Sequence, residues 1–160
     1  MTRFSRPAPL AAFALVAAAT AGCSVTNPQT TAQYYVPSDG AEARLGADVT
    51  VTSVLFLAAD EDSPGTLLAR VVNEGTEPVE VTITGQDVDV DVTVDVDPNS
   101  TVEIGPDGDE EVLVEPMGAV PGTSVPLMVS VGDGSTSEVV RATVLDDTLE
   151  EYADLVPSGD

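Results

Sequence analysis

The chain has 160 residues, enough for one domain, and carries five Lys+Arg against 28 Asp+Glu, a formal charge of -23. Such an acidic surface repels phosphate backbones and anionic lipid headgroups, so we expect neither nucleic-acid binding nor electrostatic attachment to a membrane. The sequence contains no His and no Lys, and its one cysteine is Cys23; Ser-His-Asp, Cys-His and Schiff-base chemistry are therefore excluded, and we expect no enzyme.

Residues 1–22 are predicted to be a lipoprotein signal peptide. Two arginines and no acid precede an apolar stretch at 10–21, which is too short to span a bilayer. It ends in TAGC at 20–23, which resembles the lipobox of bacterial lipoproteins, whose cysteine thiol is alkylated with diacylglycerol. We therefore expect the general secretory route, lipidation of Cys23, and a place on the outer face of the cell membrane, anchored in its lipid bilayer. An ordinary cleavable signal is the alternative.

The rest of the chain divides into a tether and one β domain. Residues 23–46 are polar, with Pro and Asp-Gly, and are predicted to form the lipidated cysteine and a flexible tether. Residues 47–146 alternate β-branched runs with turn residues and predict an all-β domain, an antiparallel cupredoxin-like or Ig-like β-sandwich of about seven strands. The predicted strands are 48–58, 67–72, 79–84, 88–96, 101–104, 111–114, and a hairpin of 126–131 with 138–144.

Residues 147–160 are predicted to form a short helix and a C-terminal tail. Thr148 is a suitable N-cap, and Glu151 three residues later would complete a capping box. Apolar side chains three or four residues apart would then share one face against the sandwich. They are Leu149, Tyr152 and Leu155 or Val156.

Residues 87–97 alternate Asp and Val, apart from Thr93. In a strand the valines fill the core face and the carboxylates point to water. Carboxylates also suit Ca²⁺, but an EF-hand loop counted from Asp87 fails, because it needs Gly at Val92 and Glu at Pro98. The alternative is a calcium site in the next acidic loop, with Asp107, Asp109, Glu110 and Glu111 as ligands.

Several segments resemble actinobacterial lipoproteins related to the periplasmic copper chaperones of the PCuAC type. They are a first strand ending in an apolar run (51–57), a strand closing on Asn-x-Gly (69–75), MGAVPG at 117–122 followed by VPL at 125–127, and the closing EYADLVP at 151–157. The likeness covers most of the chain after Cys23. It implies a cupredoxin-like β-sandwich, in agreement with the strands predicted from periodicity.

The resemblance also implies copper as a cofactor, but the ligand pattern is incomplete. Family members hold Cu(I) with a His or Met, a Met after ten residues, and a later His-x-Met. After Cys23, this chain has no His and only Met117 and Met128, with ten residues between them. Met117 falls where the family's last ligand group would be. Two thioethers alone are a weak Cu(I) site, and core packing is the other interpretation of both methionines.

These observations predict a membrane-anchored, extracytoplasmic lipoprotein that acts as a non-catalytic binding or scaffold module related to copper chaperones, with a degenerate metal site. Its partner would be an envelope protein that the sequence does not identify. Two alternatives stay open: a weak Cu(I) chaperone using Met117 and Met128, and a calcium-dependent envelope or adhesion module using the acidic loop.

Overall fold

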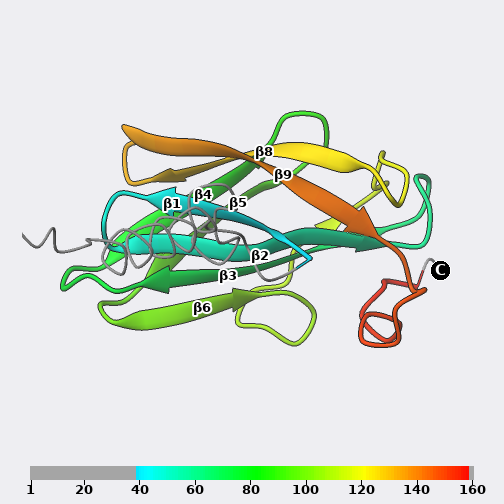
Figure 1. The fold of residues 1–160 in the computed structure, drawn as a ribbon, viewed down its shortest axis with the longest axis horizontal. Coiled ribbons are helices and arrows are strands. Elements are labelled where there is room, and N and C mark those ends of the chain that lie inside the picture. The colour runs from blue at the N-terminus through cyan, green and yellow to red at the C-terminus, as the bar shows by residue number, and fades with distance from the viewer. Residues whose placement is uncertain (1–38, 159–160) are drawn as a thin grey trace, which may run out of the picture. The chain divides into compact units, whose positions relative to one another are not determined.

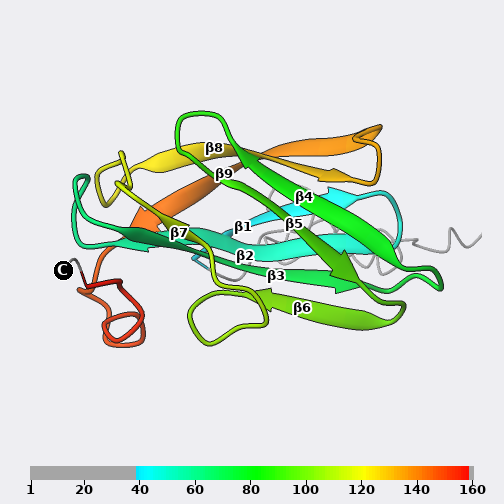
Figure 2. The same ribbon diagram turned by 180° about the vertical axis from the view of Figure 1, so that it is seen from behind.

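The computed structural model describes residues 39–158, which form nine β-strands (Figures 1 and 2). The strands are β1 (Ala41–Leu45), β2 (Val49–Ala58), β3 (Gly65–Asn73), β4 (Val79–Gly85), β5 (Asp91–Val96), β6 (Ser100–Ile104), β7 (Leu113–Val114), β8 (Ser124–Val131) and β9 (Thr136–Leu145). The sheet order is β5-β4-β8-β9-β2-β3-β6, with β1 beside β2 and β7 beside β3. The sheet curls over until its two end strands, β5 and β6, contact each other. The prediction of an all-β sandwich is confirmed.

Strand β2 connects the two halves of the sandwich. Its first part pairs with β1, whereas residues 55–57 run parallel to β9. Between these parts Ser53 has a φ of 55°, and the register with β3 shifts between Thr52 and Leu55, which marks a β-bulge. The positions in the main core change there from odd to even numbers: Val49 and Val51, then Val54, Phe56 and Ala58. The parallel pair makes the sheet mixed rather than purely antiparallel.

The core between the layers is almost entirely aliphatic. Its largest fully buried side chains include Phe56, Leu67, Ile83, Met117 and Leu127. Burying one such side chain stabilises the fold by about 1.5–3 kcal/mol relative to leaving it in water. Valines from all the long strands complete the packing.

A buried side-chain amide secures the end of β3. Asn73 is 1% exposed, and its Nδ2 donates to the carbonyl oxygens of Glu77 (2.8 Å), Val96 (3.1 Å) and Asp97 (3.1 Å). Its Oδ1 accepts a hydrogen bond from the Gly75 amide at 2.9 Å. The Asn-x-Gly motif therefore ties the β3–β4 turn to the end of β5 through hydrogen bonds inside the core.

The alternating acidic segment forms a shorter strand than predicted. A turn occupies its start, where the Gly85 amide donates to the carbonyl of Val90 at 2.8 Å. β5 therefore begins at Asp91 rather than at Val88. Within β5 the predicted alternation holds, because Val94 and Val96 are buried while the aspartates and Thr93 are exposed.

Two predictions at the ends of the domain differ from the structure. β1 lies inside 23–46, the segment expected to be tether, and it forms because Ala43 and Leu45 bury their side chains in the core. It is held at its outer edge by Glu138, whose carboxylate accepts a hydrogen bond from the Arg44 amide at 2.8 Å. The folded domain therefore begins before Ala47.

The prediction of a C-terminal helix is wrong. Residues 147–155 form turns, in which the amides of Tyr152 and Leu155 donate to carbonyls three residues back, both at 2.9 Å. The Thr148 amide donates to the Asp146 carboxylate at 3.0 Å, so a local turn replaces the expected N-cap. A segment this short gains too few intrahelical bonds to form a helix without a strong core contact. Leu149, expected to face the sandwich, is 42% exposed.

Candidate functional site

Met117 lies in the interior of the domain. It follows β7 in a loop whose backbone is pinned to the β2–β3 connection: the Met117 amide donates to Ser63 O at 2.9 Å, and the Gly118 amide to Glu61 O at 2.8 Å. The side chain is 0% exposed. A Cβ added to Gly65 would lie 2.6 Å from the Met117 sulfur. The thioether therefore packs directly against the backbone of β3, and glycine leaves the room for it.

Met128 lies on the opposite side of β8. Its neighbours along the strand, Leu127 and Val129, are buried in the core, so strand alternation turns Met128 outward. It is 41% exposed and pairs across β8 and β9 with Val139, which is 56% exposed. The structure therefore places one methionine inside the sandwich and the other on its surface, and does not bring the two sulfurs together around one ion.

The acidic loop after β6 folds back on that strand. The amides of Asp109 and Glu110 both donate to the carbonyl of Glu103, at 2.7 and 3.2 Å, and the Asp109 carboxylate accepts from the Glu103 amide at 2.9 Å. All four predicted calcium ligands (Asp107, Asp109, Glu110 and Glu111) are exposed. Within the described part of the chain, no three acidic, His or Cys side chains are gathered so as to hold a metal ion.

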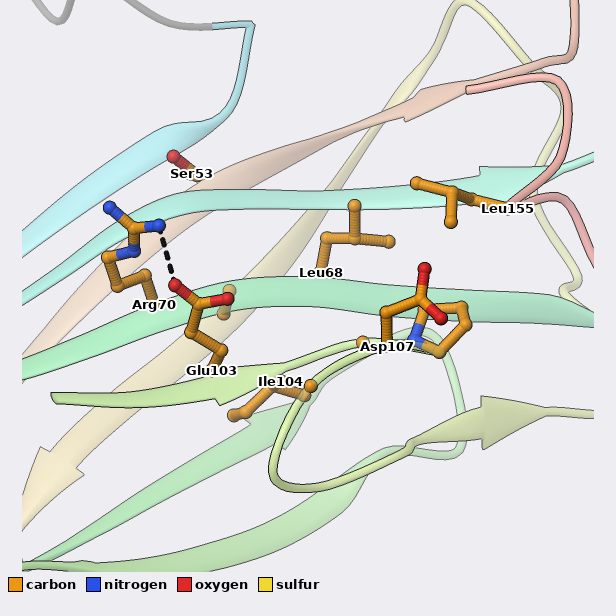
Figure 3. A pocket seen from close by; sticks show the side chains of 11 residues that line it. Ser53, Leu68, Arg70, Glu103, Ile104, Asp107 and Leu155 are labelled. Carbon is orange, nitrogen blue, oxygen red and sulfur yellow. Dashed lines mark hydrogen bonds and ion pairs between the residues drawn. The ribbon is translucent and has the colours of Figure 1, made fainter. Parts of the chain in front are cut away.

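A surface pocket of about 310 Å³ lies on the outer face of β3 and β6 (Figure 3). At one end Arg70 and Glu103 form an ion pair, with Nη2 and Oε1 2.6 Å apart and both side chains more than half exposed. Asp107 and Leu155 lie at the other end, and Leu68 lies between. This pocket was not predicted from the sequence, because its walls come from β2, β3, β6 with the loop after it, and the C-terminal turns. The one lining residue that the sequence indicated was Leu155, which was expected, as an alternative to Val156, to face the sandwich.

The C-terminal wall of this pocket is attached to the start of the domain. The Tyr152 hydroxyl donates a hydrogen bond to the Asp39 carboxylate, with 3.2 Å between Oη and Oδ2. Burial, and then the negative charge of Asp39, raise the pKa of the Tyr152 phenol above its usual 10.0. Hydrogen bonds from the Thr148 side chain and amide lower the pKa of the Asp146 carboxyl.

Cys23 and the rest of the predicted signal peptide lie outside the described residues. Between residues 39 and 158, no helix has the length and apolar character needed to cross a membrane.

No protein-family model matches the sequence, and it matches none of the curated proteins. Two solved structures are similar to this chain in fold. The apo PCuAC domain of PmoF2 superposes with a TM-score of 0.55 at 15% sequence identity, over 68% of this chain and 97% of that domain. The chain has the PCuAC fold. The copper-bound PCuAC domain from PmoF2 aligns with a TM-score of 0.49 at 16% identity, over 66% of this chain and 97% of that one.

The resemblance inferred from the sequence is therefore confirmed for the fold. At this identity the likeness concerns the path of the backbone, and the copper belongs to the PmoF2 domain. The PCuAC fold here carries aliphatic side chains in its core and an acidic exterior.

Proposed function

We propose that this protein is an extracytoplasmic lipoprotein whose PCuAC-fold domain is a non-catalytic binding module rather than a copper carrier. The observation that supports it most directly is the separation of the methionines, with Met117 sealed in the core and Met128 on the outer face of β8. Cu(I) needs two or more soft ligands around one point. Without His in the sequence, a second soft ligand near either methionine is lacking among residues 39–158.

A binding role for the domain is supported by its charge and its inventory of side chains. After residue 22 the chain carries 28 acidic against three basic residues. Such a surface attracts cationic partners and repels anionic ones. The absence of His and Lys leaves few groups for acid–base or nucleophilic catalysis near neutral pH.

Cu(I) competition with a chromogenic chelator under reducing conditions tests the loss of the copper site. The full chain in a non-ionic detergent is compared with Cys23→Ser, which removes the one thiol, and with Met117→Leu and Met128→Leu. We expect Cys23→Ser to leave the chelator fully loaded. Tight binding by Cys23→Ser that either methionine change abolishes would overturn the proposal and restore the copper-chaperone function.

Lipidation is tested by growing cells with labelled palmitate and measuring the intact mass of the purified protein. We expect label on the wild type, and a mass that lacks residues 1–22 and gains acyl groups. Cys23→Ser is the matched control, because it changes one atom and removes the acceptor thiol. An unlabelled wild-type protein starting at Cys23 would indicate an ordinary cleaved signal.

A further inference from the structure

The pocket beside β3 and β6 lies where three irregular segments meet these two strands. Ser53, at the bulge of β2, has a left-handed backbone beside the pocket, a conformation that is unfavourable for a non-glycine residue. Gly105, with a φ of 154°, begins the loop after β6, and a Cβ added there would be in ordinary van der Waals contact with the Leu68 side chain, at 3.6 Å. The C-terminal turns add the remaining wall through Leu155.

The floor of the pocket is apolar. Leu68 and Leu155 point toward it from β3 and from the C-terminal turns (Figure 3), whereas the Ile104 side chain is 3% exposed and belongs to the core. Its volume is at the lower end of the range for ligand pockets, about 300–1,000 Å³. A small aliphatic group therefore fits, and would displace water from the side chains of Leu68 and Leu155.

The rim of the pocket is acidic on balance. Arg70 is neutralised by Glu103 at 2.6 Å. At the opposite end the Asp107 carboxylate has no hydrogen-bond or ion-pair partner among residues 39–158, and Figure 3 shows it beside Leu155. The nearest uncompensated charge is therefore negative, as is the charge of the whole domain. An anionic ligand would be repelled on approach.

We propose that this pocket binds an ammonium or guanidinium group carried on an aliphatic stem. The cation lies against Asp107, and the stem covers Leu68 and Leu155. The inference rests on the proposed binding role and gives it a ligand class. A free alkyl polyamine and a Lys or Arg side chain of a partner protein share this chemistry.

The test is a ligand-observed NMR titration of the full-length Cys23→Ser protein in a non-ionic detergent. The probes are n-butylguanidinium, guanidinium without a stem, and pentanoate, which has a similar stem and the opposite charge. We expect butylguanidinium to bind with a Kd of about 1 mM, well below that of the other two probes. Equal binding of guanidinium and butylguanidinium would overturn the role of the apolar floor.

Variants decide where the cation binds. Asp107→Asn should weaken butylguanidinium binding by about fivefold, the upper range for a partly exposed ion pair. Asp91→Asn is the matched control, because it removes the same charge from an exposed position on β5 and should change little. Equal effects of the two changes would mean that the negative surface attracts the cation in general, and would overturn the proposed binding in the pocket.

Arg70→Gln tests the sign of the ligand charge. Removing the guanidinium frees the Glu103 carboxylate, so a cationic probe should bind about two- to fivefold more tightly. Weaker binding of the cation by Arg70→Gln, or binding of pentanoate to the wild type as tight as that of butylguanidinium, would overturn the proposal.

The source of the cation is addressed by spermidine and by a blocked Leu-Arg-Leu tripeptide. Binding of either that depends on Asp107 supports the inference and identifies the source, and binding of neither overturns it. None of these titrations requires lipidation or copper, so a failed pocket leaves the tests of Cys23 and of the methionines standing.

Discussion

Replacement of Asn73 by Ala is the sharpest test of how this fold is held together. The side chain is 1% exposed, and its amide joins the end of β3 to the β3–β4 turn and the end of β5. Ala fits the strand backbone and removes only the side-chain amide. The backbone groups left behind cannot all find water, because the bond to Val96 O is buried.

The expected loss follows from counting bonds that exist at one time. Nδ2 has two hydrogens for three carbonyl oxygens, so it makes two full bonds at once, and Oδ1 accepts a third from Gly75. Each contributes about 1 kcal/mol net. Asn73→Ala should therefore lower the free energy of unfolding by about 3 kcal/mol. With a urea m-value of about 2 kcal/mol/M, the midpoint falls by about 1.5 M.

Urea unfolding followed by far-UV circular dichroism is the assay, because the sequence has no Trp for fluorescence. Asn99→Gly is the control. Asn99 is exposed, donates one side-chain bond to Gly75 O at 3.2 Å, and has a φ of 54°, which Gly adopts without strain. It should cost about 1 kcal/mol or less. If Asn73→Ala costs no more than the control, the buried amide does not hold the turns together.

Three further perturbations test other parts of the structure. Met117→Ala should lower the free energy of unfolding by about 2–5 kcal/mol, and Met128→Ala should change it by less than about 0.5 kcal/mol; similar losses in urea titrations would contradict their placement inside and outside the sandwich. Gly65→Ala should cost about 1–3 kcal/mol, because the new methyl group meets the Met117 sulfur at 2.6 Å. The melting temperature should partly recover in the double variant with Met117→Ala, and a purely additive loss would rule out that contact. Burial, and then the charge of Asp39 and the hydrogen bond to it, raise the pKa of Tyr152, so the folded state favours the neutral phenol. The resulting contribution to stability is fully present below pH 10.0, the usual phenol value, and is lost as pH rises through the higher folded value. The absorbance titration at 295 nm of wild type minus Tyr152→Phe should show one phenol ionising above pH 10.0, and a midpoint at or below 10.0 would refute it.

Sequence periodicity was enough to predict the strands that bury one face against the core. The hairpin of β8 and β9 agrees with the prediction to within two residues at each end, because Gly132 and Gly134 take the positive φ values that its turn needs. β1 was missed although Ala43 and Leu45 alternate with charged residues. Alanine is a weak β-former, so the strand depends on pairing with β2, which no local pattern shows.

The bulge in β2 changes the alternation of apolar residues in the sequence, but neighbouring apolar residues obscure the change. The apolar phase changes at Ser53, from odd to even positions, but Leu55 and Leu57 are also buried and make the run continuously apolar. The outward position of Met128 could be predicted from the alternation of β8. The location of Met117 could not, because a loop has no period. The pocket depends on four segments brought together by the fold, and sequence spacing contains no information about such distances.

Strand β5 also has a consequence for how copies of this protein behave toward one another. It ends the sheet, and its contact with β6 involves no strand pairing, so the backbone groups on its outer edge would template a strand from another molecule. Between two copies of β5 in register, Asp91 and Asp95 would come close to carboxylates of the other copy, and such like-charged neighbours oppose pairing. The double change Asp91→Asn with Asp95→Asn removes this repulsion and leaves a valine-rich edge, so it should accelerate fibril formation.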